Sequence, residues 1–223
     1  VCQQVAETPG LLRTVNQRYL FAGIRCPRGV AHAKIVLLLN REEGRLLVGS
    51  GNLGVRGYTL NEELFCRWSY RPEDAQHLAE FAAVRQIVDG LIDRTWFQPE
   101  AASRIEHMWE QAPWIRASVD TSTARVRSNL DIPFLDQLQS AIAGEAVEEL
   151  CVLSAFYDES AVALDRMLRT LNPGRCVVYV QPGEGGTSVD PEALGRVLAG
   201  WGGDSEVRVY STQGLKGKAY CHA

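Results

Sequence analysis

A histidine and a lysine lie two residues apart at the head of a long apolar run. They are His32 and Lys34, and a Gly-Ser-Gly-Asn segment at residues 49–52 follows after a charged turn. An imidazole can attack phosphorus, an ammonium beside it can neutralise phosphate oxygens, and small polar residues can donate to those oxygens. These residue types at this spacing predict a site that binds and cleaves a phosphate ester.

His32 is the predicted nucleophile, and its imidazole ring needs a hydrogen-bond partner that fixes its orientation. On a β-strand, residues two apart project from the same face, so we expect His32 and Lys34 to meet one phosphate together. Glu63 is predicted to accept a hydrogen bond from the second ring nitrogen of His32, which raises the basicity of the imidazole.

The segment at residues 49–52 supplies the other predicted phosphate contacts. Ser50 and Asn52 are expected to donate to phosphate oxygens, while Gly49 and Gly51 let the backbone approach the ligand. Two simpler interpretations exist, because H-x-K arises often by chance and Gly-Ser-Gly-Asn is an ordinary hairpin-end loop. The co-occurrence of both elements on one hairpin, with an Asn-x-Glu pair behind them, favours function.

The elements that must position these residues begin with a hairpin. A continuous apolar run at residues 35–39 predicts a strand buried on both faces. Residues 41–44 predict a turn and residues 45–48 a partner strand, so antiparallel pairing brings the two motif halves together. Further strands are expected at residues 18–25, 62–70, 150–156, 175–181, 206–211 and 215–221, and helices at residues 72–96, 99–114, 158–171 and 190–201.

The motif residues resemble the first catalytic motif of the phospholipase D superfamily. The matching positions are His32-x-Lys34, Gly49-Ser50-x-Asn52 and Asn61-x-Glu63. The long apolar run and the charged turn look most like the tyrosyl-DNA phosphodiesterase branch. Leu39 stands where the motif has an aspartate, a replacement also found in that branch. In this superfamily two such motifs meet at a pseudo-twofold axis; one histidine forms a phosphohistidine and the other protonates the leaving group, with no metal.

The second half of the chain resembles the second repeat of that superfamily, up to its own H-x-K strand. The resemblance implies that Lys218 stabilises the transition state and that Ser154 contacts the substrate. Lys216 stands in place of the second histidine. A lysine with its ordinary pKa of ~10.4 is poorly matched to acid–base catalysis at neutral pH, although it can still bind phosphate as a point charge.

The alternation of strands and helices predicts a layered α/β fold, in which helices flank a mixed sheet. The resemblance implies two pseudo-symmetric phospholipase D-like halves, both incomplete. Residues 1–71 would end the first repeat, residues 72–115 would form a helical connector, and residues 116–223 would begin the second repeat. The chain starts without an initiator methionine and stops just after a strand-like run, so we expect it to belong to a longer protein with further domains.

Two functions are compatible with these residues. The resemblance implies a phosphodiesterase that needs no metal and no other cofactor and that acts on nucleic acid rather than on lipid. The alternative is a catalytically degenerate domain that binds phosphodiesters or serves as a scaffold in a larger protein, because Lys216 replaces the second histidine.

The composition narrows the choice of partner. The net charge is −4, so there is no global basic field, and a nucleic acid would have to be held by a local patch. No apolar run reaches the ~18 residues of a membrane span. Cys151 and Cys176 lie in apolar strand-like runs and are expected to be buried thiols, which favours a reducing compartment and predicts a cytoplasmic protein. No spacing of metal-binding residues predicts a metal site.

Other candidate residues carry weaker signals. A glycine-rich loop at residues 182–186 lacks the lysine and the serine or threonine of a P-loop. Four aromatic residues could stack on bases, but packing in a helical core is the simpler interpretation; they are Trp96, Phe97, Trp109 and Trp114. The remaining histidines are expected to be surface, packing or terminal residues; they are His77, His107 and His222.

Overall fold

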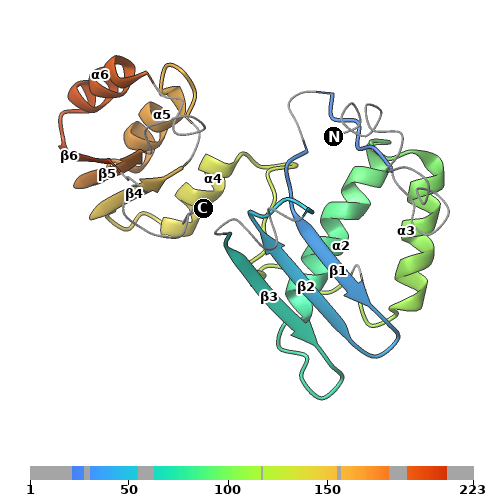
Figure 1. Ribbon diagram of the computed structural model, residues 1–223. Helices are drawn as coiled ribbons and strands as arrows, with labels where there is room; N and C mark the ends of the chain where they lie inside the picture. The colour runs from blue at the N-terminus through green and yellow to red at the C-terminus, as the bar shows by residue number, and fades with distance from the viewer. Residues whose placement is uncertain are drawn as a thin grey trace, which may run out of the picture. The chain divides into compact units, whose positions relative to one another are not determined.

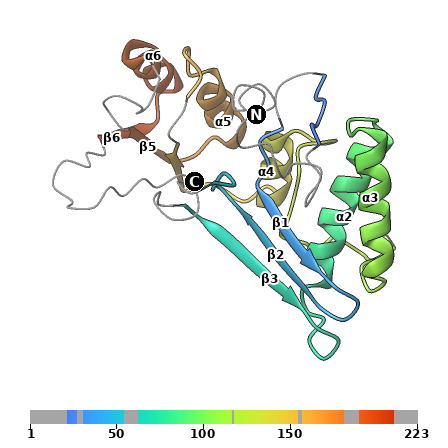
Figure 2. The same cartoon turned by 45° about the vertical axis from the view of Figure 1, so that its right-hand side comes forward.

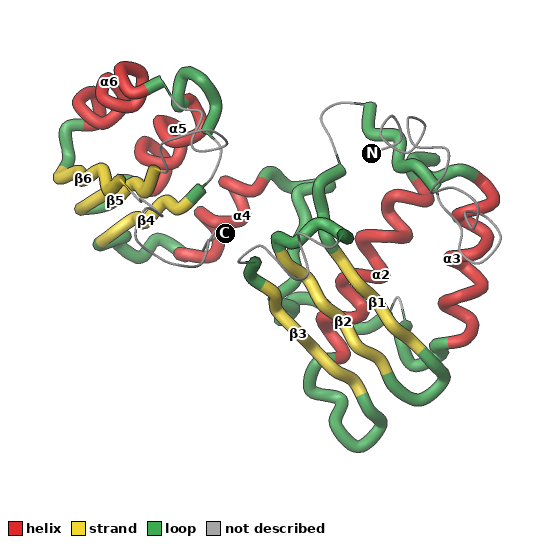
Figure 3. Tube along the Cα trace, viewed as in Figure 1, coloured by secondary structure: helices red, strands yellow, loops and turns green. Residues whose placement is uncertain are grey.

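The chain has a mixed α/β fold, as predicted. The computed structural model describes residues 22–27, 31–54, 63–116, 118–154, 157–180 and 190–209. Within these residues there are six strands in two three-stranded sheets, together with five helices (Figures 1 and 3). The chain divides into two compact units, one made of Val1–Val48 and Cys66–Leu130 and the other of Gly49–Phe65 and Asp131–Ala223.

The first sheet contains the predicted hairpin. Strand β1 (Ile35–Leu39) pairs antiparallel with β2 (Gly44–Gly49), and β3 (Phe65–Tyr70) lies on the other side of β2. Asn40 makes the turn, since its side-chain oxygen accepts from the backbone N–H groups of Glu42 and Glu43, both at 2.8 Å. This Asx-type turn explains why a polar segment follows the apolar strand so abruptly.

Two helices cover one face of this sheet, and the prediction that β1 is buried on both faces was wrong, because Leu38 is 60% exposed. They are α2 (Leu78–Asp93) and α3 (Pro99–Gln111), and both lie on the same side of β1, β2 and β3 in two views (Figures 1 and 2). Helix α3 begins at a proline, which fits the first helical turn. Helix α2 begins at Leu78 rather than at Pro72, because Arg71 and Asp74 exchange backbone hydrogen bonds of 3.3 and 3.0 Å and close a turn before the helix.

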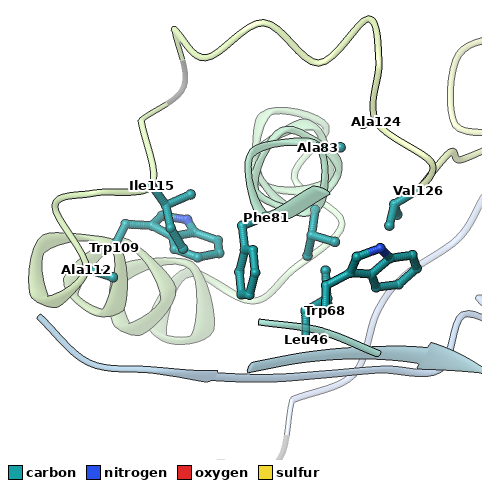
Figure 4. Packing of buried hydrophobic residues seen from close by; sticks show 10 residues of the cluster. Leu46, Trp68, Phe81, Ala83, Trp109, Ala112, Ile115, Ala124 and Val126 are labelled. Atoms are coloured by element: carbon teal, nitrogen blue, oxygen red, sulfur yellow. The ribbon is translucent and has the colours of Figure 1, made fainter. Parts of the chain in front are cut away.

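The core of the first unit lies between the sheet and these helices. Leu46 of β2 and Trp68 of β3 point toward α2, where Phe81 is fully buried (Figure 4). Trp109 of α3 is 5% exposed and belongs to the same cluster, so its interpretation as a packing residue is confirmed. The segment at residues 72–115 thus supplies the helical layer of this core.

Trp114 closes the turn end of the same core. Its ring stacks on Tyr70 with centroids 4.0 Å apart, and its indole N–H donates to the carbonyl oxygen of Asn40 at 2.9 Å. A Cβ atom added at Gly44 would come within 2.5 Å of the Trp114 ring and 2.8 Å of Phe81. Gly44 is therefore required where the aromatic rings press against β2.

The second unit contains a parallel sheet. Its strands are β4 (Glu149–Leu153), β5 (Arg175–Val180) and β6 (Asp204–Val209), in that order. Helices α5 (Val162–Leu171) and α6 (Pro191–Trp201) connect them. Two crossovers of the same hand place both helices on one face of the sheet. Leu164, Leu168 and Leu194 pack there against Cys176 and Val178.

Helix ends in this unit differ from the sequence prediction in detail. Asp190 caps α6 as its sequence predicts, accepting from the N–H of Glu192 at 3.0 Å. Helix α5 begins at Val162 rather than at Asp158, yet the Asp158 carboxylate accepts from the N–H groups of Val162 at 2.6 Å and Ala163 at 3.0 Å. A further helix, α4 (Phe134–Ile142), was not predicted, and none of its residues is buried.

The two cysteines expected to be buried have different environments. Cys176 is fully buried against the helices, and burial raises the pKa of its thiol to about 11. The prediction for Cys151 was wrong, because this residue lies on the face of β4 that α5 and α6 do not cover, and its thiol donates to Glu149. That hydrogen bond raises the pKa of the Cys151 thiol.

Two other predictions concern the ends of the chain and membranes. The strand expected at residues 18–25 is absent from its described part, residues 22–25, and the strand expected at residues 215–221 lies outside the described residues. None of the helices that the structure describes has the length and apolar character needed to cross a membrane.

Candidate functional site

His32 and Lys34 lie directly before the first strand. His32 is exposed and Lys34 is half-buried, and the Lys34 ammonium donates to the carbonyl oxygen of His32 at 2.7 Å. This bond holds a positive charge next to the backbone of the histidine. Both residues precede β1, so strand alternation does not fix the directions of their side chains, contrary to the expectation that they share a strand face.

The hairpin register relates the two halves of the motif. The pair nearest the open end of the hairpin is Ile35 with Val48. Lys34 comes immediately before Ile35 in the chain, and Gly49 comes immediately after Val48. The H-x-K segment and the Gly-Ser-Gly-Asn segment therefore leave the same end of the hairpin, as the sequence predicted.

The residues around Gly49 leave no space for a side chain at this position. A Cβ atom at this position would clash with the carbonyl oxygen of Leu64 and would approach the Phe65 ring to 2.5 Å. The close approach of the backbone to β3 thus explains this glycine without a ligand. Gly51 is buried and Asn52 is exposed, so the Asn52 amide is accessible to a substrate.

Ser50 and Glu63 are joined by a short hydrogen bond. The Ser50 hydroxyl donates to the Glu63 carboxylate at 2.6 Å and accepts from the Leu64 N–H at 3.1 Å. The Ser50 N–H also donates to the Leu64 carbonyl oxygen at 3.0 Å. Because a hydroxyl has only one hydrogen, this arrangement directs the Ser50 proton to Glu63. Ser50 therefore fixes the segment that carries Glu63, and the expected contact from Glu63 to His32 stays a prediction.

The predicted residues of the second half are only partly described. Ser154 is half-buried and directly follows β4, at the carboxyl end of the parallel sheet. Ligands of open α/β sheets bind at this end of the strands. Asn61, Lys216 and Lys218 lie outside the described residues, as do residues 182–186 and His222.

Tyr157 lies near Ser154 in the chain and serves the fold. Its hydroxyl donates to the carbonyl oxygen of Tyr179 at 3.1 Å, and burial raises its pKa to about 12. The phenol therefore stays neutral at physiological pH and acts as a structural donor.

The remaining aromatic and histidine candidates have structural partners or surface positions. The Trp109 indole donates to Asp89 at 3.0 Å, and the Arg85 guanidinium lies over its ring. His107 is exposed and pairs with Glu110 at 3.0 Å, as expected of a surface residue. Within the described part of the chain, no group of three or more His, Cys, Asp or Glu side chains could hold a metal ion.

Sequence reasoning did not single out three arginines that line one cavity of the first unit. They are Arg45 of β2, Arg67 of β3 and Arg71 just after β3. A signal was present, since Arg67 and Ser69 alternate with the core residues Trp68 and Tyr70. That period of two marks the face of the strand opposite the core.

Comparison of the chain with protein-family models, with curated proteins and with solved structures gave no match.

Proposed function

We propose that this chain is a phosphodiesterase of the phospholipase D type, which cleaves nucleic-acid phosphodiesters without a metal ion. The hairpin register carries the proposal, because the pairing of Ile35 with Val48 sends both motif segments from one end of one hairpin. The short bond between Ser50 and Glu63 adds support, since it fixes two more motif positions relative to each other.

The proposed reaction has two displacement steps. In the first, a ring nitrogen of His32 attacks phosphorus, a phosphorus–nitrogen bond forms, and the bond to the leaving oxygen breaks. Lys34 and Lys218 balance the charge on the non-bridging oxygens, and the Asn52 amide donates to one of them. In the second step, water attacks phosphorus, the bond to His32 breaks, and the proton of the water passes to the group that protonated the leaving oxygen in the first step.

The leaving oxygen needs a proton in the first step unless it is a stable anion. In the proposed arrangement, Lys216 occupies the position from which that proton would come. Its role as an acid at neutral pH demands a pKa far below the ordinary lysine value of ~10.4, which burial or a neighbouring cation would have to produce.

A chromogenic diester tests the proposal directly. Bis(p-nitrophenyl) phosphate releases a coloured anion, and the assay is run with EDTA present. We expect His32→Ala to lower the rate by at least about a hundredfold, since the nucleophile is lost. His107→Ala is the matched control, because His107 is an exposed histidine on α3. Equal rates for the parent and His32→Ala would reject the proposal.

A second candidate function is a degenerate phosphodiester-binding or scaffold domain. The observation that favours it is Lys216 at the position of the second histidine. This candidate predicts binding of an oligonucleotide with no turnover, even at high protein concentration.

Restoring the acid distinguishes the two candidates. A large gain in hydrolysis of an unactivated diester by Lys216→His would mean that the rest of the site is intact and lacks only a proton donor. Lys216→Arg is the control, since it keeps the charge but cannot act as an acid near neutral pH. No turnover in the parent or in Lys216→His would favour the binding domain.

A further inference from the structure

The first unit contains an arginine-lined cavity on the outer face of its sheet. The cavity has a volume of about 290 Å³ and is lined by Arg45, Arg67, Ser69, Arg71 and Asp74. In a strand, neighbouring side chains point to opposite faces. Because Leu46 and Trp68 pack against the helices, Arg45, Arg67 and Ser69 project from the other face.

Two of the arginines in this cavity pair with a carboxylate, and the third is available to a ligand. Glu43 accepts from Arg45 at 3.2 Å and from Arg71 at 3.3 Å, so one carboxylate holds two guanidinium groups in place. Arg71 uses its Nε for this contact. Among the residues that the structure describes, none forms a side-chain hydrogen bond or ion pair with Arg67. Its exposed guanidinium therefore uses none of its five N–H donors on a residue that the structure describes.

The charge in the cavity favours an anion. Three arginines stand against two carboxylates, because Glu43 pairs with Arg45 and Arg71 and Asp74 lines the cavity, so one positive charge remains. The Asp74 carboxylate accepts from the Gln76 side chain at 3.3 Å. Guanidinium groups bind phosphate through paired N–H donors, with more geometric specificity than an ammonium group. The volume leaves room for a phosphate group.

The position of the cavity relates it to the hairpin motif. Arg45 and Gly49 are four residues apart on β2. At ~3.3 Å per strand residue, they are separated by roughly 13 Å along the strand. A nucleic-acid strand carries a phosphate on every nucleotide, so one molecule can place a phosphate at each end of β2. A single lipid headgroup cannot do so.

We propose that Arg45, Arg67 and Arg71 form a subsite for a backbone phosphate of a nucleic-acid strand, at a distance from the bond that is cleaved. This inference rests on the proposed function for the identity of the polymer, and it supplies the local basic patch that a chain with a net charge of −4 requires. The subsite contacts phosphate rather than bases, so it strengthens binding without selecting a sequence.

The test is the binding of a fluorescein-labelled oligothymidylate to the full chain, measured by anisotropy over a range of salt concentrations. We expect Arg67→Gln to weaken binding roughly tenfold, the cost of losing one charged hydrogen-bonding group. The slope of log affinity against log salt should also fall in magnitude by about 0.7, the value for one phosphate contact on a single strand. Arg67→Lys should recover part of the affinity, because it keeps the positive charge but lacks the paired N–H donors of a guanidinium group.

Arg104→Gln is the matched control, because Arg104 is an exposed arginine on α3, away from the cavity. Equal weakening by Arg67→Gln and Arg104→Gln would overturn the inference, since it would reflect net charge alone. The inference would also be overturned if the oligonucleotide did not bind, or if the chain bound phosphatidylglycerol vesicles instead. The assay needs no turnover, so an inactive chain whose affinity depends on Arg67 would reject the proposed reaction and keep the subsite.

Discussion

Ser50 shows how a single motif residue acquires a role that its type alone does not reveal. Its position in Gly-Ser-Gly-Asn predicts a donor to phosphate, whereas its hydroxyl donates to Glu63 at 2.6 Å. The two residues are thirteen positions apart in the chain. Nothing local in the sequence distinguishes a serine that contacts a ligand from one that anchors a distant carboxylate.

Removing the Ser50 hydroxyl should destabilise the hairpin end. We expect Ser50→Ala to lower the free energy of unfolding by about 1–2 kcal/mol, because the half-buried Glu63 carboxylate loses a charge-assisted hydrogen bond. Urea denaturation followed by circular dichroism measures this change. Ser103→Ala on the exposed surface of α3 is the control and should change stability by less than about 0.5 kcal/mol. A similar loss in both variants would argue against a special role for Ser50.

The two glycines of the hairpin differ in how well their roles could be predicted. The motif predicts that Gly49 opens space for a phosphate, but the nearest obstacles to a side chain there are Leu64 and Phe65. The sequence places Gly44 only in a turn, and it proves to lie against Trp114 and Phe81. Both explanations depend on contacts between residues far apart in the sequence, which spacing alone does not encode.

At the scale of elements, the contact of Gly44 with the aromatic rings gives a packing prediction. Gly44→Ala should lower the free energy of unfolding by about 1–3 kcal/mol, because the added methyl group overlaps rigid rings in a filled core. Thermal unfolding followed by tryptophan fluorescence measures the loss. Gly195→Ala is the contrast, since nothing lies within 4 Å of a Cβ at that helical position. It should raise stability by about 0.5–1 kcal/mol. A stable Gly44→Ala variant would contradict the packing described for β2.

The capping of α5 by Asp158 gives a prediction with a pH dependence. The N–H groups of Ala163 and Val162 lower the pKa of the Asp158 carboxyl below its ordinary value. A lowered folded-state pKa stabilises the fold above the unfolded-state pKa, and this contribution is lost as the pH falls through the folded-state pKa. Asp158→Ala should therefore cost about 1 kcal/mol at neutral pH.

Urea unfolding of the parent and Asp158→Ala at several pH values checks this expectation. The difference between the two proteins should be constant at neutral pH and should shrink once the pH falls below about 3.9. The neighbouring exposed Glu159 provides the control, and Glu159→Ala should leave stability nearly unchanged. A difference that persists unchanged in strong acid would show that the Asp158 charge does not cap the helix.

The elements themselves were predictable where local signals were strong. Hairpin strands β1 and β2 follow from an apolar run, a polar turn and a second apolar run, and α6 follows from an Asp-Pro start. The start of α2 was not predictable, because the turn before it depends on the backbone hydrogen bonds that Arg71 and Asp74 exchange. A proline can begin a turn as readily as a helix, and the local sequence is compatible with both.

For the whole molecule, the class of fold was predictable from the sequence. The assignment of chain segments to structural units was less predictable. Alternating strands and helices indicated a mixed α/β protein, and both a hairpin sheet and a parallel βαβαβ sheet are present. The helices of residues 72–115 are predicted as a connector between two halves. In the structure they pack their apolar faces on the first sheet, in one core with Leu46 and Trp68. The two pseudo-symmetric halves stay a prediction.

The central claim is that His32 forms a covalent bond to phosphorus, and an activated diester isolates that step. The p-nitrophenolate leaving group is stable without a proton, so the first displacement does not need the missing histidine. The second displacement does need a base, and Lys216 is poorly suited to supply one. The intermediate should therefore accumulate, with a burst of about one p-nitrophenolate per chain.

The decisive measurement is mass spectrometry of the chain quenched in alkaline denaturant during that burst. We predict a p-nitrophenylphosphoryl adduct, which keeps the second aryl group of the diester, on the peptide that contains His32; it should be present in the parent and in His107→Ala and absent from His32→Ala. Release of p-nitrophenolate with no burst and no adduct on that peptide would contradict it.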